Sequence, residues 1–167
     1  MHVRSLGPLV KARGLRDDAL ALGPNLRPMI ILDTNVVTEL MRPAPEQRVL
    51  RWFGNQAAED LHVTAITVAE ILYGIELISG SRRRDVVRAG AEKVFEDVFA
   101  DRILTFEDRA ARAFSQIVSS RRRQGKAMTE FDAQIAAITR VHGATLATRN
   151  PYVFEGCGVR LVNPWEG

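Results

Sequence analysis

The sequence has very little cysteine and no long apolar segment. Cys157 is the one cysteine among 167 residues, so the chain cannot close an internal disulfide, which is typical of a protein in a reducing compartment. No apolar run approaches the roughly 18 to 20 residues that a membrane-spanning helix needs. Residues 1–28 contain neither a long apolar stretch nor a small-residue cleavage pattern, which argues against a secretory signal. We therefore expect a cytoplasmic protein that does not enter a membrane.

Most of the chain also lacks an excess of charge of one sign. Residues 1–28 hold five basic and two acidic residues, which account for the whole formal net charge of +3. Residues 29–167 are neutral overall, so net charge gives no evidence of nucleic-acid binding. The first 28 residues show no clear periodicity, and we expect little order in this extension. A misassigned start codon, with Met29 as the structural start, is the favoured interpretation.

The composition, with 46% hydrophobic and 26% charged residues, is that of one globular domain, which we place at residues 29–167. Apolar periodicity predicts strands that alternate with helices along the whole domain. That order indicates right-handed crossovers and a parallel sheet with helices on both faces, an α/β/α fold whose ligands bind at the carboxyl ends of the strands. The expected strands are 29–32, 61–64, 103–106, 144–148 and 160–162. The expected helices are 35–41, one opened by Pro45, 67–79, 81–99 with Ser81 as its cap, 108–123 and 130–141.

Three acidic residues stand at ends of these elements. Asp33 directly follows the first strand, where it can cap the next helix. Glu70 lies three residues after Thr67, which fits a capping box in a first helical turn, and Asp132 repeats this spacing after Thr129. A structural role as a helix cap can therefore explain each carboxylate separately.

Parallel α/β topology also allows these three positions to converge on one cleft. Neighbouring carboxylates raise one another's pKa and destabilise the fold unless a cation lies between them. A site made of carboxylate oxygens selects a hard ion such as Mg²⁺, or Mn²⁺. Such an ion can activate a hydrolytic water and neutralise charge on a phosphodiester, so we expect metal-assisted phosphodiester cleavage.

Several short motifs give the chain a resemblance to a known family. Their order and spacing resemble the PIN-domain toxins of VapC type, and especially the FitB-like branch, over residues 29–167. The motifs are ILDTNVVTELMRP at 31–43, AITVAE at 65–70 with YGI at 73–75, ILTFE at 103–107, DAQIAA at 132–137, ATRN at 147–150 and NPW at 163–165.

The resemblance implies a metal-dependent endoribonuclease that acts as the toxin of a type II toxin–antitoxin system. In that family the residues matching Asp33, Glu70 and Asp132 hold Mg²⁺ and carry the catalysis. The implied partners are RNA as substrate, a cognate antitoxin protein, and a second copy of the chain in a homodimer or a toxin–antitoxin hetero-oligomer. The antitoxin segment is expected in a groove near the helix 67–79, where Tyr73, Ile75, Leu77 and Ile78 give more apolar surface than one side of a small sheet can use.

Substrate binding is assigned to four residues beside the acidic positions. Thr34 and Asn35 can contact the scissile phosphate or simply cap the helix, and Arg149 is the best candidate for an RNA contact. Asn150 stands where relatives carry Asp or Asn, and its amide oxygen can hold water without adding negative charge.

Two further positions depart from the family pattern. Val153 stands where many relatives have an acidic residue, which leaves open whether one metal or two are held. Glu107 occupies a position more often held by Asp and is a candidate for a supporting role around the acidic residues.

Two alternatives remain on the sequence alone. The missing acids at Asn150 and Val153 leave room for a PIN scaffold that binds RNA or a partner without cleaving. A receiver-like Mg²⁺-binding signalling domain is disfavoured, because it would need paired acids after the first strand and a lysine after the last, and no lysine follows Lys126.

Overall fold

The computed structural model describes residues 28–166, so the expectation for the extension falls, apart from Pro28, outside the described residues. The strands are β1 (Ile30–Leu32), β2 (Leu61–Thr64), β3 (Ile103–Leu104), β4 (Thr145–Ala147) and β5 (Arg160–Val162). The helices are α1 (Thr34–Leu40), α2 (Gln47–Gly54), α3 (Ala65–Glu76), α4 (Ser81–Val98), α5 (Asp108–Arg123), α6 (Glu130–Val141) and α7 (Pro151–Phe154). A short 3-10 helix, Ala58–Asp60, leads into β2.

The five strands form one parallel sheet in the order β3-β2-β1-β4-β5. The central strand β1 is flanked by β2 and β4, with Ile31 opposite His62 on one side and Leu146 on the other. All strands run the same way, so their carboxyl ends meet at one edge. The residues that follow β1, β2 and β4 are therefore brought together although they are far apart in sequence.

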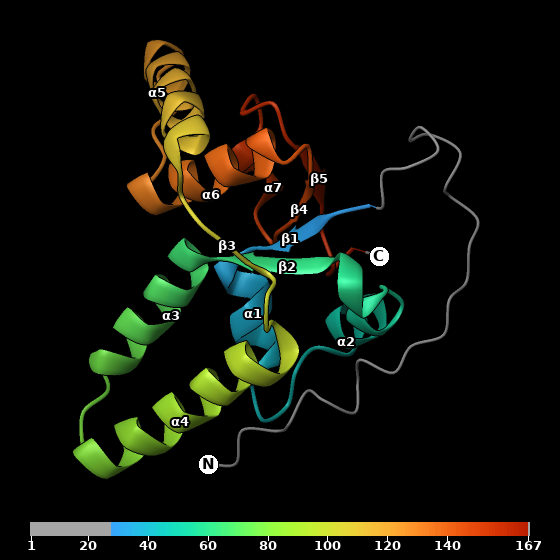
Figure 1. Ribbon diagram of the computed structural model, residues 1–167, viewed down its shortest axis with the longest axis vertical. Coiled ribbons are helices and arrows are strands. Elements are labelled where there is room, and N and C mark those ends of the chain that lie inside the picture. The colour runs from blue at the N-terminus through green and yellow to red at the C-terminus, as the bar shows by residue number, and fades with distance from the viewer. Residues whose placement is uncertain (1–27, 167) are drawn as a thin grey trace.

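Helices cover both faces of this sheet (Figure 1). Each face has its own apolar cluster. Leu32 belongs to the cluster with α1–α4, and its neighbour Ile31 belongs to the cluster with α5–α7, because successive side chains of a strand point to opposite faces. Both residues are fully buried. The expected α/β/α fold is thus confirmed, and none of the helices in residues 28–166 has the length and apolar character needed to cross a membrane.

The bounds of α5 and α6 and of β2 and β5 agree with the sequence prediction. The strand expected at 103–106 ends at Leu104, because Phe106 leaves the sheet edge and packs edge-on against Phe114 of α5, with ring centroids 6.1 Å apart. The expected cap at Ser81 is wrong: Gly80 precedes the helix with φ 89°, and Ser81 is its first residue. The sequence analysis missed α7, a single turn opened by Pro151.

Candidate functional site

Asp33 lies between the carboxyl end of β1 and the start of α1. Its Oδ1 accepts a hydrogen bond from the backbone N–H of Thr34 at 2.8 Å, so a capping role is real. Its Oδ2 accepts two more, from Asn35 Nδ2 and from the Thr148 hydroxyl, each at 2.7 Å. Asp33 is only 4% exposed. A helix cap can be exposed to solvent, so capping alone does not explain why the Asp33 carboxylate is buried.

Glu70 lies deeper in its helix than the sequence predicted. The helix α3 begins at Ala65, because the Thr64 hydroxyl caps it by accepting the N–H of Thr67 at 3.0 Å. The expected capping box between Thr67 and Glu70 is therefore wrong. Glu70 Oε2 instead accepts a hydrogen bond from the Thr34 hydroxyl at 2.5 Å, which joins α3 to the start of α1.

Asp132 is the third residue of α6, whose N-cap is Thr129. The Thr129 hydroxyl accepts the N–H of Asp132 at 3.0 Å and donates to its Oδ2 at 2.7 Å. A local structural role for this carboxylate is thus confirmed. The helix start also brings Asp132 near enough to Asp33 and Glu70 for its charge to act on both.

Asp33, Glu70 and Asp132 form a group that we call the acid cluster, in which the pKa values of Asp33 and Glu70 are raised. Burial raises the pKa of Asp33, and the charge of Asp132 raises it further, against the three hydrogen bonds that lower it. Burial also raises the pKa of Glu70, where the bond from Thr34 lowers it and the charges of Asp33 and Asp132 raise it. The fold therefore holds negative charge where the folded chain itself disfavours it.

This charge and these donor atoms fit a hard divalent cation, since the donors are all carboxylate oxygens. The arrangement is not a ready-made cage. Within residues 28–166, no three His, Cys, Asp or Glu side chains are grouped closely enough to hold a metal ion as they stand. Hydroxyl and amide donors currently occupy oxygens of all three carboxylates, so binding an ion requires some side-chain adjustment.

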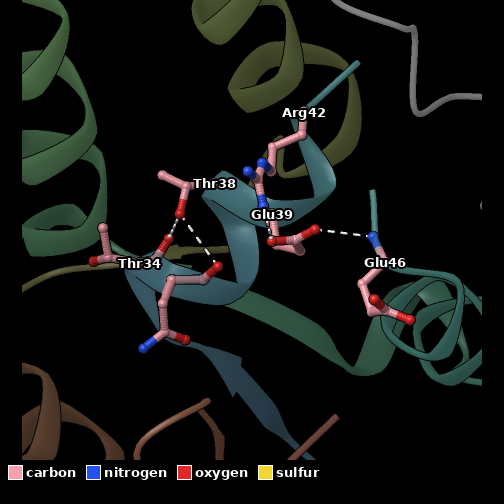
Figure 2. Close-up of polar contacts among 6 residues, drawn as sticks. Thr34, Thr38, Glu39, Arg42 and Glu46 are labelled. Atoms are coloured by element: carbon pink, nitrogen blue, oxygen red, sulfur yellow. Dashed lines mark hydrogen bonds and ion pairs between the residues drawn. The ribbon is translucent and has the colours of Figure 1, made fainter. Parts of the chain in front are cut away.

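The structure brings the four predicted substrate residues to this same edge. Thr34 is tied to Glu70, and Asn35 bridges β1 and β4: its Oδ1 accepts the backbone N–H of Arg149 at 3.1 Å while its Nδ2 donates to Asp33. Asn150 follows with its side chain making no cap bond to α7, and both Arg149 and Asn150 are exposed. The neighbouring Thr38 hydroxyl, by contrast, bonds only backbone carbonyls of its own helix (Figure 2).

Thr148 is a site residue that the sequence analysis did not single out. It is fully buried, donates to Asp33 at 2.7 Å and accepts from Asn35 Nδ2 at 3.3 Å and from the backbone N–H of Asn150 at 3.1 Å. The available signal was its position: Thr148 follows β4 as Asp33 follows β1, and these strands are neighbours.

Two other residues stand outside the acid cluster. Glu107 is exposed at the start of α5, where it accepts a hydrogen bond from the Thr105 hydroxyl at 2.8 Å and lines a separate hollow with Arg109 and His142. Val153 packs against the apolar cluster of α5–α7. The structure therefore gives neither residue a contact with the acid cluster.

An apolar groove of about 350 Å³ starts beside the acid cluster and runs between α1, α3 and α4. Its apolar lining is Met41, Ile71, Ile75, Ile78, Val87 and Ala91. The surplus apolar surface expected on α3 is present at Tyr73 and Leu77, which are 62% and 67% exposed. Ile75 is buried in the core and Ile78 packs against it, and both also line the groove.

Comparison with known proteins agrees with this geometry. The family model of the PIN domain matches residues 30–155. The chain therefore belongs to the PIN-domain family, and the assignment expected from the sequence motifs is confirmed.

Individual relatives place it beside the toxins of that family. The chain is 38% identical to toxin FitB of Neisseria gonorrhoeae over 138 residues, which are 83% of this chain and 99% of FitB. It is 36% identical to VapC ribonuclease Y4jK of Sinorhizobium fredii, with the same coverage of both chains. The crystal structure of FitAcB from Neisseria gonorrhoeae matches with a TM-score of 0.77 and 37% identity, covering 83% of this chain and all of that one.

Proposed function

We propose that the protein is a metal-dependent endoribonuclease and the toxin of a type II toxin–antitoxin pair. The observation that best supports this is the acid cluster at the carboxyl edge of the parallel sheet, where burial and the charge of Asp132 raise the pKa of Asp33 and of Glu70. Carboxylates with a raised pKa at such an edge are characteristic of functional sites. The relatives called toxin FitB and VapC ribonuclease point to the same activity.

In this proposal Asp33, Glu70 and Asp132 hold Mg²⁺, or Mn²⁺, through their carboxylate oxygens. A cation held by these carboxylates would supply the Lewis acidity that activates water and the charge that offsets the phosphodiester. The protein's own polar groups prepare the carboxylates: the Thr148 hydroxyl and the Asn35 amide orient Asp33, so that its oxygens keep their places before substrate arrives.

Substrate is bound by groups that surround these acids. Arg149 and Asn150 are exposed at the same edge and offer donors to the RNA backbone. Thr34 and Asn35 contribute a hydroxyl and an amide beside the scissile phosphate. RNA as substrate implies action in the cytoplasm.

The proposed protein partner is an antitoxin whose apolar segment lies in the groove between α1, α3 and α4. The groove adjoins Thr34 and Glu70, so a segment bound there can also block access to the acid cluster. The exposed side chains of Tyr73 and Leu77 extend the apolar surface beyond the groove, which suits a partner or a second copy of the chain.

A cleavage assay on total RNA tests the enzymatic part of the proposal. The full chain should cut RNA with Mg²⁺, and EDTA should stop the reaction. Asp33→Asn and Asp132→Asn should both fall to the EDTA background, because each removes a negative charge that binds the cation. The matched control is Glu107→Gln, an exposed carboxylate outside the acid cluster, which should keep full activity.

Full cleavage by either acid-cluster variant, with contaminating nuclease excluded, would contradict the assignment. Intact RNA binding without any cleavage by the unmodified chain would favour the non-cleaving scaffold instead. For the partner, co-purification with the protein encoded beside this gene should fail in Leu77→Asp and persist in Ser115→Asp, a change at another exposed position, on α5.

A further inference from the structure

Arg149 is anchored to the acid cluster through its backbone. Its N–H donates to Asn35 Oδ1 at 3.1 Å, and Asn35 in turn donates to Asp33 at 2.7 Å. The preceding residue, Thr148, bonds Asp33 directly. The start of the Arg149 side chain is thus fixed within one residue of the acids, while the side chain itself is exposed.

The guanidinium of Arg149 lies over an aromatic ring. Its central carbon is 5.3 Å from the centroid of the Trp165 ring, within the range of a cation–π contact. In residues 28–166, no carboxylate or carbonyl accepts a hydrogen bond from this guanidinium. The ring attracts the face of the guanidinium, whereas its five N–H donors lie in the plane and remain available for an anion.

Trp165 is itself held firmly against the sheet. The backbone N–H of Trp165 donates to Asn163 Oδ1 at 3.1 Å, and its backbone carbonyl accepts from Arg48 at 3.3 Å. The Trp165 side chain packs against the apolar cluster of α1–α4. The segment follows β5, whose Val162 carbonyl accepts the N–H of Thr148 at 3.0 Å. Arg149 and Trp165 therefore lie in the segments that follow the adjacent strands β4 and β5.

A buried carboxylate adds a second influence on Arg149. Glu39, 6% exposed, accepts hydrogen bonds from the Glu46 N–H at 2.8 Å and from Arg42 at 3.0 Å (Figure 2). No salt bridge joins it to Arg149 in the described chain, but the positive charge of Arg149 acts on it. The negative charge of Glu39 therefore attracts the guanidinium of Arg149, although more weakly than it attracts Arg42.

We propose that Trp165 is a positioning residue that holds Arg149 in place to bind a phosphate of single-stranded RNA beside the acid cluster. This inference rests on the proposed ribonuclease function. Trp165 acts only through Arg149, so its removal should change RNA binding by the amount that a correctly placed Arg149 contributes.

The test measures binding of a short single-stranded RNA in an Asp33→Asn background, where the RNA is not cut. Trp165→Leu should weaken binding about two- to five-fold, the usual effect of an exposed cation–π contact. It should also lower the dependence of log Kd on log salt by up to about 0.7, the value of one lost phosphate contact on a single strand. Trp165→Phe, which keeps an aromatic face, should retain most of the affinity.

Two controls separate positioning from a general loss of structure. Trp52→Leu removes the other tryptophan, which packs against the same apolar cluster, and should lower the melting temperature without changing RNA affinity or salt dependence. In an Arg149→Gln background, Trp165→Leu should have no further effect on binding.

The inference is overturned if Trp165→Leu binds RNA like its parent, or if it still weakens binding after Arg149→Gln. It is also overturned if the parent does not bind RNA at low salt. Cleavage of total RNA by the unmodified chain decides separately whether the proposed function survives such a result.

Discussion

Two buried carboxylates at opposite ends of α1 should respond in opposite ways to loss of charge. Asp33 and Glu39 are 4% and 6% exposed. Burial raises the pKa of Asp33, with the charge of Asp132 adding to it. Burial also pushes the pKa of Glu39 up, but the Glu46 N–H and then Arg42 outweigh it, so this pKa is lowered. The variants Asp33→Asn and Glu39→Gln therefore make a matched pair.

The sign of each effect follows from linkage between ionisation and folding. For Asp33, stability is highest below the ordinary pKa of 3.8 and is lost as pH rises through the raised folded value. For Glu39, the stabilisation is present above the ordinary 4.5 and is lost as pH falls through the lowered folded value. At pH 7, Asp33 therefore costs stability through its charge, and Glu39 contributes stability.

The hydrogen bonds set the magnitudes. An Asn at position 33 can keep the Asn35 and Thr148 donors on its carbonyl oxygen and loses the bond from Thr34, about 1 kcal/mol, which relief of the buried charge offsets. We expect unchanged or higher stability. Glu39→Gln loses a charge-assisted bond worth about 1.5–3 kcal/mol. At about 2–4 °C per kcal/mol, its melting temperature should fall by about 3–12 °C.

Thermal unfolding in EDTA at pH 7 and at decreasing pH measures both effects. As pH falls, the gain in melting temperature of Asp33→Asn over the unmodified chain and the loss in melting temperature of Glu39→Gln should both shrink toward zero. Mg²⁺ at about 100 times its Kd should stabilise the unmodified chain and Glu39→Gln by about 2.7 kcal/mol, and Asp33→Asn much less. The reasoning is refuted if Asp33→Asn loses as much stability as Glu39→Gln, or if all three proteins gain equally from Mg²⁺.

Two further predictions concern the site residue Thr148 and the glycine Gly158, which precedes β5. Thr148→Val should lower stability by about 1–3 kcal/mol and reduce cleavage, because it leaves the donors and acceptors around Asp33 unpaired. Thr148→Ser keeps the hydroxyl and should retain both properties. Denaturant unfolding measures the stability of the two variants, and the RNA assay measures their cleavage. Gly158→Ala should cost about 1–2 kcal/mol because its φ is +74°, while Gly54→Ala, in open space in α2, should be neutral or stabilising in the same measurement.

Much of the fold is readable from local patterns. The bounds of α5 and α6 agree with the sequence prediction because their apolar spacing repeats over several turns. In addition, α5 begins with the acidic residue Asp108, and α6 follows the N-cap Thr129. Errors fall where a local pattern competes with a nearby contact. The Thr67–Glu70 spacing fits a capping box, but the N-cap of α3 is Thr64, three residues earlier. Glu70 therefore lies inside the helix and accepts a hydrogen bond from the Thr34 hydroxyl.

The sequence by itself determined the alternation of strands and helices, the position of Asp33 after a buried strand, and the family motifs, because these depend on neighbours along the chain. Only the tertiary structure decided that Thr148 bonds Asp33, 115 positions away, and that Trp165 lies over Arg149. It also decided that Asp33 and Glu39, six residues apart, have opposite pKa shifts. The Thr148–Asp33 and Trp165–Arg149 contacts form because strands β1, β4 and β5 are neighbours in the sheet. No single segment of the sequence carries a signature of that pairing.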